Sequence, residues 1–346
     1  MKKIVSVFAL TTIFLLAACG NNDADVGANE TNEQEGDTIK LTYAFFAPAN
    51  TFPAVQMEEW KKRLEERTDG QVEVELFPGG SLLEANNMFD GVASGTADIG
   101  LTSTSYEPGR FPLLAISDMP SGYNSALSAS KVVADLIREY PPEALKDFKI
   151  ITAFATEPAY IQSRNPITSL EDLSGQQLRI AGGLTPIMEE LGASPVGMSQ
   201  AEVPEALQTG IVDGYVSSRE ILQDSRLAEM VEYTTNYPLA LNTFIAVMNK
   251  DTWESLPDHV QDVIDELSEE MTEFTGKYLD EHVRDSIEWS EENHHHQIVE
   301  LTDSDKWDEK LEEFQQNYVE ELESQDYPAR EYYEQMKEKI EKYNEE

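Results

Sequence analysis

Residues 169–183 read Ser-Leu-Glu-Asp-Leu-Ser-Gly-Gln-Gln-Leu-Arg-Ile-Ala-Gly-Gly. Leu178 and Ile180 predict a short buried strand, which ends at Gly182–Gly183. Arg179 therefore places a full positive charge in an apolar segment, where an unpaired charge is strongly unfavourable. A guanidinium can hold a carboxylate with two parallel hydrogen bonds. The sequence leaves two sources for that carboxylate, a bound ligand or an acidic side chain of the protein core.

On both sides of this stretch, strand patterns alternate with helix patterns. Alternation of apolar and polar residues marks the strands, and apolar residues at helical spacing mark the helices. The predicted strands are Ile39–Phe46, Gln71–Phe77, Asp98–Leu101, Ile150–Phe154, Ile211–Val216 and Asn242–Asn249, and the predicted helices are Phe52–Arg67, Leu82–Ser94, Thr185–Leu191 and Ser199–Thr209. Such alternation predicts a mostly parallel sheet covered by helices, with ligands bound at the carboxyl ends of strands.

The C-terminal part of the chain has a helical pattern. An apolar stripe runs through residues 257–296 and is interrupted only by Gly276, which predicts a helix far longer than usual for a globular protein. Residues 297–346 are acidic and amphipathic, and they predict further helices. The aromatic stripe of this region, which begins at Trp307, is interpreted as core contacts.

A series of short segments carries a resemblance to a known family. The segments are Thr68-Asp-Gly70, Phe77-Pro-Gly-Gly-Ser-Leu82, Gly95-Thr-Ala-Asp-Ile-Gly100, Tyr106-Glu-Pro-Gly-Arg-Phe-Pro112, Leu173-Ser-Gly175, Leu178-Arg-Ile180, Leu191-Gly-Ala-Ser-Pro-Val196 and Ala206-Leu-Gln-Thr-Gly-Ile-Val-Asp-Gly214. In order and spacing they resemble the solute-binding proteins of tripartite ATP-independent periplasmic (TRAP) transporters, the DctP family. Leu83 departs from the pattern, because the family usually has glycine there.

The resemblance implies an α/β fold of two lobes, like that of periplasmic binding proteins. A hinge joins the lobes, a long helix at 257–296 spans both of them, and C-terminal helices follow. Lobe I is expected to comprise residues 39–157, with residues 245–285 returning to it, and lobe II residues 158–244. In this family the arginine that matches Arg179 holds the carboxylate of an organic-acid ligand.

The N-terminus reads as a targeting segment. Two lysines precede the apolar run Ile4–Leu16, and Leu16-Ala-Ala-Cys19 resembles a bacterial lipobox. The resemblance implies that residues 1–18 are a lipoprotein signal peptide and that Cys19 becomes lipidated. A lone buried thiol is the alternative.

Residues 19–38 are rich in Asn, Asp, Glu and Gly and predict an acidic flexible linker. We therefore expect an extracytoplasmic protein that is lipid-anchored to the outer face of the cell membrane. Because Cys19 is the only cysteine of the chain, the sequence excludes a disulfide framework, and no cysteine remains as a metal ligand or nucleophile.

The formal net charge of −41 argues against nucleic-acid binding, which requires a basic surface. It does not exclude an anionic ligand, because surface charge is screened by salt while one arginine in a closed cleft acts locally. The acidic excess is typical of a protein exposed to a salty or alkaline environment.

The candidate ligand residues follow predicted strands, so they gather at the carboxyl ends of the sheets. They are Phe46, Asn50, Ala85, Ser103 and Tyr106 in lobe I, and Tyr160, Arg179, Ser217 and Phe244 in lobe II. Better-known acid-sugar binders of the family carry a second arginine where this chain has Ala159 and Tyr160. Each aromatic residue lines either the ligand or the core. Together the candidates suggest a ligand with one acid group and a moderately apolar body.

The sequence offers no catalytic or metal-binding motif of useful specificity. His294, His295 and His296 are consecutive, and adjacent helical residues point about 100° apart, so the three cannot converge on one ion. We therefore expect no metal, no cofactor and no enzymatic activity.

Taken together, the sequence predicts a monomeric receptor that closes two lobes on a small organic acid and delivers it to TRAP membrane permease subunits. Two alternatives remain open. One is a solute-binding protein of another transporter type, such as one driven by ATP. The other is a secreted α/β hydrolase or lyase, which the fold class alone does not exclude.

Overall fold

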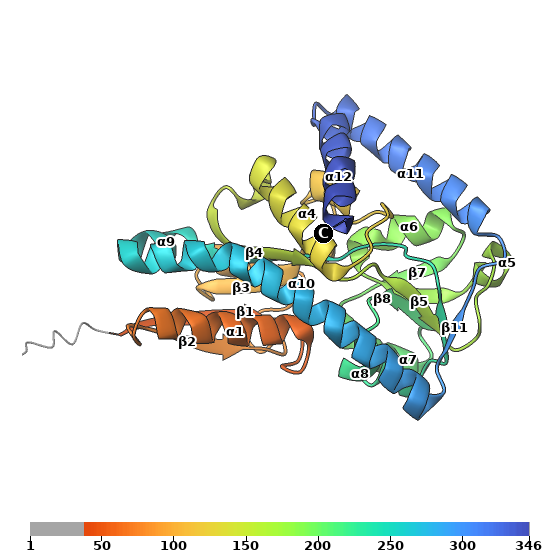
Figure 1. The fold of residues 1–346 in the computed structure, drawn as a ribbon, viewed down its shortest axis with the longest axis horizontal. Coiled ribbons are helices and arrows are strands. Elements are labelled where there is room, and N and C mark those ends of the chain that lie inside the picture. Colours follow the sequence, from red (N-terminus) through yellow and green to blue (C-terminus); the bar gives the residue numbers. More distant parts are fainter. Residues whose placement is uncertain (1–37, 346) are drawn as a thin grey trace, which may run out of the picture. The chain divides into compact units, whose positions relative to one another are not determined.

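The computed structural model describes residues 38–345. The predicted signal peptide, Cys19 and nearly all of the predicted linker lie outside the described residues. Two mixed β-sheets with flanking helices make up the described part (Figure 1). The strand order is β2-β1-β3-β10-β4 in the first sheet and β11-β9-β5-β8-β6-β7 in the second.

The elements have the following bounds. The strands of the first sheet are β1 (Ile39–Phe45), β2 (Val72–Phe77), β3 (Ile99–Ser103), β4 (Phe148–Ala155) and β10 (Thr243–Asn249). Those of the second sheet are β5 (Tyr160–Ser163), β6 (Gln177–Ile180), β7 (Ser194–Gly197), β8 (Gly214–Ser217), β9 (Tyr233–Thr235) and β11 (Gln297–Val299). The α-helices are α1 (Phe52–Arg67), α2 (Met88–Ala93), α3 (Pro112–Ser117), α4 (Ala126–Glu139), α5 (Leu170–Leu173), α6 (Thr185–Glu190), α7 (Val203–Thr209), α8 (Ile221–Asp224), α9 (Lys250–Ser255), α10 (Asp258–His294), α11 (Ser304–Ser324) and α12 (Ala329–Asn344). Two short 3₁₀ helices matter for the site, η1 (Thr104–Tyr106) and η4 (Gln200–Glu202).

The two sheets are mixed, with five parallel and four antiparallel strand pairings, so the prediction of a mostly parallel sheet holds only narrowly. β1 pairs in parallel with β2 and β3, and β6 pairs in parallel with β7 and β8. β10 is antiparallel to β3 and β4, and β5 is antiparallel to β8 and β9. The central antiparallel strands β5 and β10 follow the two short crossings between the sheets, whereas β11, which follows the helical crossing through α10, is parallel to β9. β5 and β10 arrive directly from the other sheet, without the helical crossover that a parallel neighbour requires.

The predicted helix Leu82–Ser94 is shorter than expected, because α2 begins only after Asn87. The Asn87 side chain accepts a hydrogen bond from the Glu84 backbone N–H (2.9 Å), which holds the preceding residues in a turn. Leu83 is buried and packs so closely against Gly91 that a Cβ there would lie 2.2 Å from a Leu83 methyl carbon. The absence of a side chain at Gly91 thus makes room for Leu83, at a position where the family described above usually has glycine.

The long helix α10 runs unbroken from Asp258 to His294, through Gly276. A Cβ on Gly276 would lie 2.6 Å from the Cα of Leu127, so the missing side chain lets α4 approach. One turn further along, the Asp280 carboxylate accepts hydrogen bonds from the first backbone N–H groups of α4. α10 contacts α1, α4 and β4 at the first sheet and α8 at the second (Figure 1). The helix therefore holds both sheets together.

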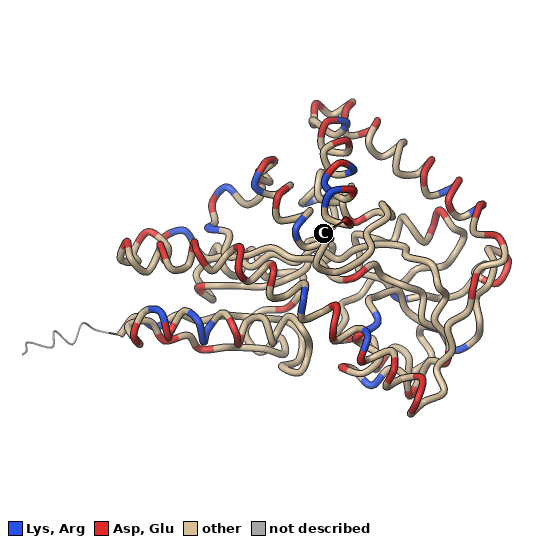
Figure 2. Tube along the Cα trace, in the orientation of Figure 1, with Lys and Arg blue, Asp and Glu red and all other residues tan. Residues whose placement is uncertain are grey.

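The C-terminal helices also contact elements of both halves. α11 packs against α3 and α6, and α12 packs against α3 and α4. Trp307 is fully buried beside Tyr237, with 5.3 Å between the ring centroids, so its predicted role as a core contact is confirmed. Acidic residues are spread along the outer helices, most visibly α10 and α11 (Figure 2). Every helix within residues 38–345 is too short or too polar to span a bilayer.

The three consecutive histidines have different surroundings, because only His294 belongs to α10. The His294 ring lies 4.6 Å from that of Trp289, and His295 ends α10 in the left-handed conformation with φ 57°. His296 is buried and hydrogen-bonded to the Thr234 hydroxyl (2.7 Å), and burial lowers its pKa. The described residues contain no cluster of three His, Cys, Asp or Glu side chains able to hold a metal ion.

Candidate functional site

Arg179 lies in β6, between the parallel neighbours β7 and β8. Leu178 and Ile180 point to the opposite face of the sheet and belong to the apolar core. Arg179 is only 1 % exposed. A cation at this depth requires hydrogen bonds and a counter-charge to offset its lost hydration.

The Arg179 guanidinium donates four hydrogen bonds, all of them to neutral groups. Nε and Nη2 donate to the Met198 carbonyl (3.0 and 2.8 Å), and Nη1 donates to Gln200 Oε1 (3.0 Å). Nη2 also donates to the Tyr106 hydroxyl (3.2 Å). No acidic side chain within residues 38–345 forms an ion pair with Arg179. The interpretation that a core carboxylate neutralises Arg179 is therefore wrong for the described part of the chain.

Tyr106 connects Arg179 to the first sheet. It ends η1, directly after β3, and its ring packs edge-on against Phe46 with 5.0 Å between the centroids. The Tyr106 hydroxyl accepts hydrogen bonds from Arg179 Nη2 and from the Gln200 backbone N–H (3.1 Å). Because both acceptor sites of the oxygen are used, its own hydrogen is available for a third group. Tyr106 therefore offers an O–H donor beside the buried cation.

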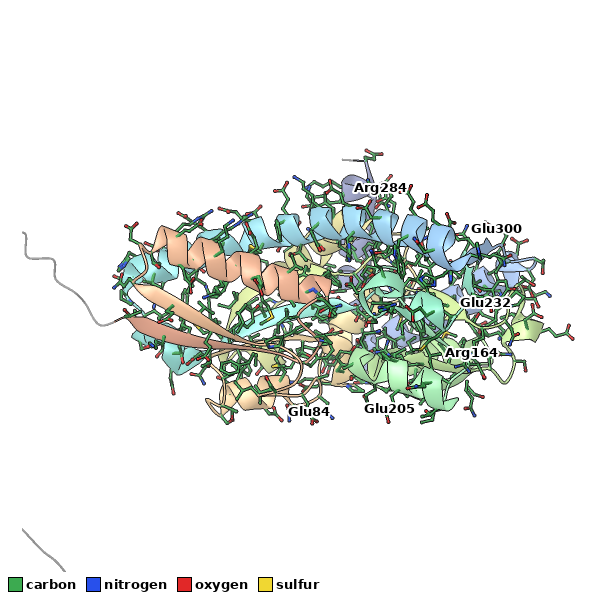
Figure 3. All side chains as sticks on the ribbon, turned by 90° about the horizontal axis from the view of Figure 1, so that it is seen from below. Glu84, Arg164, Glu205, Glu232, Arg284 and Glu300 are labelled. Atoms are coloured by element: carbon green, nitrogen blue, oxygen red, sulfur yellow. The ribbon has the colours of Figure 1, made fainter. Side chains whose placement is uncertain are left out.

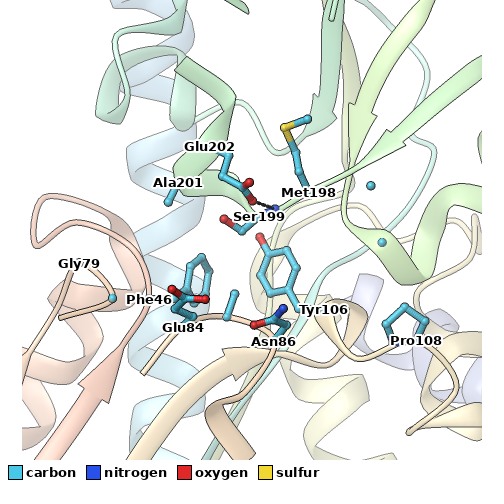
Figure 4. A pocket seen from close by; sticks show the side chains of 14 residues that line it. Phe46, Gly79, Glu84, Asn86, Tyr106, Pro108, Met198, Ser199, Ala201 and Glu202 are labelled. Carbon is cyan, nitrogen blue, oxygen red and sulfur yellow. Dashed lines mark hydrogen bonds between the residues drawn. The ribbon is translucent and has the colours of Figure 1, made fainter. Parts of the chain in front are cut away.

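Two cavities adjoin this contact. Arg179 lines the smaller one, of about 40 Å³, together with residues that follow strands of both sheets. The larger one, of about 560 Å³, is lined from the first sheet by Glu84 and Asn86 and from the second by Met198, Ser199, Ala201 and Glu202 (Figure 4). Phe46 and Tyr106 line both cavities and so form the partition between them.

The structure brings together most of the residues predicted from the sequence. Phe46, Tyr106, Arg179, Ser217 and Phe244 line the smaller cavity. Ala85 lines the larger one. Asn50, Ser103 and Tyr160 line neither cavity.

The three residues outside the cavities have structural contacts. The Asn50 amide donates to the Asp224 backbone carbonyl (2.5 Å), and this bond joins the two halves of the chain. Ser103 is the N-cap of η1, and its hydroxyl shares a hydrogen bond with the Ser105 hydroxyl (2.7 Å). That turn sets the position of Tyr106. A position directly after a strand thus predicts that a residue lies near the cavity. Local hydrogen bonds, such as those of the η1 cap, decide whether its side chain lines the cavity.

Tyr160 lies under an arginine that the sequence analysis did not single out. Arg219 donates from Nε and Nη2 to the two carboxylate oxygens of Glu157 (3.0 and 2.9 Å), and its backbone N–H donates to the same carboxylate (2.6 Å). Its guanidinium lies 4.1 Å from the centroid of the Tyr160 ring. An arginine therefore does lie beside Tyr160, but a protein carboxylate already neutralises it.

Several lining residues were missed from the sequence. They include Phe52, Thr156, Gln200, Ser218, Glu220 and Asn242. Gln200 begins η4 inside a capping box, in which the Ser199 N–H donates to Glu202 Oε2 (2.8 Å). The sequence analysis interpreted Ser199–Thr209 only as a helix, although its start lies at the carboxyl end of β7. Glu220 follows β8 closely, a signal that could have identified it.

Comparisons with known proteins give the family. A model described as bacterial extracellular solute-binding protein, family 7 (DctP), matches residues 43–326. The chain belongs to this family.

A TRAP periplasmic solute-binding protein of Desulfovibrio salexigens, which has been solved as an open complex, is 40 % identical to this DctP-family chain. The TM-score is 0.78, over 88 % of this chain and 96 % of that chain. A TRAP solute-binding protein from a marine metagenome, specific for aromatic acid ligands, is 25 % identical with a TM-score of 0.83 and covers 88 % of this chain and 99 % of that chain.

A solute-binding protein of Roseobacter denitrificans is 27 % identical over 202 residues, which is 57 % of this chain and 62 % of that protein. The predicted family and the α/β fold class are confirmed by these similarities. The two alternatives, a receptor for another transporter type and a secreted hydrolase, are not favoured. The family is extracytoplasmic and serves transport.

Breaking the Arg219–Glu157 pair should destabilise the fold. Glu157 is 5 % exposed, so Arg219→Met leaves a buried carboxylate without its cation. We expect the free energy of unfolding to fall by about 2–4 kcal/mol in urea titrations followed by circular dichroism. The double variant Arg219→Met/Glu157→Gln should recover much of the loss.

Arg138→Met is the matched control, because it breaks an exposed pair with Asp135. Its effect should be about 1 kcal/mol or less. Equal losses in the two single variants would show that the Arg219–Glu157 pair does not stabilise the fold.

Proposed function

We propose that this protein is the receptor of a TRAP transporter and that it captures a small organic acid by pairing the ligand carboxylate with Arg179. The observation that supports the proposal is a buried guanidinium with four hydrogen bonds to neutral groups, lining a cavity. A ligand carboxylate supplies the counter-charge that the described part of the protein does not. It would also accept the charge-assisted hydrogen bonds to which a guanidinium is suited.

Neighbouring donors support the same assignment. The Tyr106 hydroxyl accepts two hydrogen bonds and keeps its own hydrogen for donation to a ligand. Gln200 Nε2 is buried and has no hydrogen-bond partner among the described residues, because Gln200 Oε1 faces Arg179. The Ser217 side chain also lines the cavity. Several donors at one place, with a cation among them, favour an anionic ligand.

The walls indicate the body of the ligand. Phe46, Phe52 and Phe244 line the cavity, and the rings of Phe52 and Phe244 meet edge-on at 5.9 Å. Such walls favour an apolar or aromatic body. The marine relative that is specific for aromatic acid ligands was solved with metahydroxyphenylacetate, which agrees with this interpretation.

We infer that binding is coupled to closure of two lobes, residues 39–157 with 245–285 and residues 158–244. The chain crosses between the sheets at residues 156–159 and again at 236–242, which are the natural hinges. A cavity of about 40 Å³ is small for an organic acid, so the lobes must part to admit one. A ligand that bridges Arg179 to the Tyr106 side then selects the closed form, which the membrane permease recognises.

The family is extracytoplasmic, and the N-terminal sequence supports a finer proposal. We propose that Cys19 carries lipid and tethers a monomeric receptor to the outer face of the membrane. Cys19→Ala should leave ligand affinity intact, because every residue that lines the cavity is far from Cys19 in the sequence, and should move the protein from the membrane fraction to the medium or the soluble fraction. Equal membrane retention of the variant and the natural protein, measured by fractionation and immunoblotting, would refute the anchor.

The carboxylate site is tested by Arg179 variants. A thermal-shift screen with benzoate, mandelate, phenylacetate and succinate first identifies acids that bind, since a ligand at about 100 times its Kd stabilises by about 2.7 kcal/mol. Arg179→Lys keeps a charge but loses the planar fork, so affinity should fall. Arg179→Ala should weaken binding by about 2–5 kcal/mol in calorimetry.

Arg284→Ala removes an exposed positive charge from α10 and serves as the control for net charge (Figure 3). It should bind as the natural protein does. Unchanged affinity in both Arg179 variants, together with a large loss of stability without ligand, would make Arg179 a purely structural residue.

A further inference from the structure

The smaller cavity holds a second unmatched group besides Arg179. Glu220 lines it and is 2 % exposed. The Ser218 hydroxyl donates to Glu220 Oε1 (2.8 Å), but Oε2 is buried with no hydrogen-bond partner among the described residues. A buried carboxyl oxygen without a partner is strongly unfavourable. Arg179 and Glu220 thus line one cavity, and within residues 38–345 they form no ion pair with each other.

Two further carboxyl groups lie near Glu220. Glu157 and Asp224 lie close enough to interact electrostatically with Glu220. Each has its own cationic partner: Arg219 pairs with Glu157, and His282 Nε2 lies 2.7 Å from Asp224 Oδ1. Glu220 is the one of these three carboxyl groups that forms no ion pair within the described residues, although the charge of Arg219 also acts on it. The cavity therefore has an unmatched cation and an unmatched carboxyl group.

We propose that the ligand is a zwitterion, whose carboxylate pairs with Arg179 and whose cationic nitrogen pairs with Glu220. The inference rests on the proposed function, because it takes the Arg179 carboxylate site as given. One ligand of this kind satisfies both groups at once and adds no net charge to a desolvated site. Its positive end would also contact aromatic walls, which attract cations.

A hydroxy acid is the main competitor, because a hydroxyl group can also bond to Glu220. Electrostatics favour the zwitterion. Tyr215, on the strand beside Arg179, is close enough to both Arg179 and Glu220 for their charges to shift its pKa in opposite directions. A ligand with separated charges can pair one end with Arg179 and the other with ionised Glu220, whereas a neutral hydroxyl brings Glu220 no charge.

The proposal predicts that ligand binding releases a proton from Glu220. Burial, followed by the charge of Asp224, raises the pKa of Glu220 to about 8, so at neutral pH the free protein holds this carboxyl mostly protonated. A bound cation favours the ionised form and lowers that pKa. Binding of a zwitterion below about pH 8 therefore releases a proton, and its affinity rises as the pH approaches that value. An acid held only at Arg179 releases none from Glu220.

Other groups facing Glu220 do not produce the same proton release. Glu157 is held by Arg219, and burial raises the pKa of Tyr215 well above its usual value. His282 is the exception, because its hydrogen bond to Asp224 raises the pKa of its imidazole, so this ring can also exchange a proton. The variant His282→Gln should keep the proton release if Glu220 is its source.

The test compares probes that differ only in the charged nitrogen. These are meta-(aminomethyl)benzoate against meta-ethylbenzoate, and γ-aminobutyrate against valerate, with meta-(hydroxymethyl)benzoate as the neutral donor. Calorimetry in two buffers of different ionisation heat gives both affinity and proton release. The proteins are the natural chain, Glu220→Gln and the control Glu205→Gln, an exposed acid on the outside of α7 (Figure 3).

We expect at least one zwitterion to bind about tenfold or more tightly than its uncharged-tail partner, with proton release. Glu220→Gln should abolish the preference and the release while keeping the affinity for the monoacid, and Glu205→Gln should change neither. A preference that persists in Glu220→Gln, equal binding of each pair, or tightest binding of the hydroxymethyl probe would overturn the proposal. If monoacids bind through Arg179 without any zwitterion preference, only this inference fails. If no acid binds, the proposed function fails with it.

Discussion

The buried positive charge of Arg179 is the constraint on which the rest of the site depends. A guanidinium without water needs compensation, and the described residues give it hydrogen bonds but no counter-charge. The Met198 carbonyl, the Gln200 side chain and the Tyr106 hydroxyl fix the plane of the fork. A cation that is already oriented in this way can bind an anion tightly, because the free-energy cost of ordering its side chain arises on folding and not on binding.

The two-sheet architecture places the groups around Arg179 on both halves of the chain. Arg179 belongs to the second sheet, Tyr106 follows β3 of the first, and the chain crosses between the sheets in two short segments. A ligand between these groups therefore contacts both halves, so its binding energy acts on their separation. α10 contacts elements at both sheets and limits how the halves can move. In a fold of two sheets with few connections between them, binding of a ligand carboxylate at Arg179 can therefore change the separation of the two halves.

Much of this was predictable from the sequence, and what was missed follows a physical pattern. A charge within an apolar strand identified Arg179, and periodicity located α1, α10 and most strands. Periodicity could not reveal the antiparallel direction of β10, because direction depends on where the previous strand ends in space. Glu220 and Gln200 were missed because one looks like a surface acid and the other like a helix cap. Among the residues that the structure describes, Glu220 Oε2 and Gln200 Nε2 are buried without hydrogen-bond partners, and both side chains line the smaller cavity.

The central claim is that Arg179 holds the ligand's carboxylate, and a crystal structure grown with the tightest-binding acid tests it most directly. The account predicts both carboxylate oxygens within hydrogen-bond distance of donors, about 2.7–3.2 Å, with at least one on an Arg179 nitrogen and the Tyr106 hydroxyl donating to the same group. A carboxylate bound elsewhere, with Arg179 still bonded only to Met198, Gln200 and Tyr106, would contradict it.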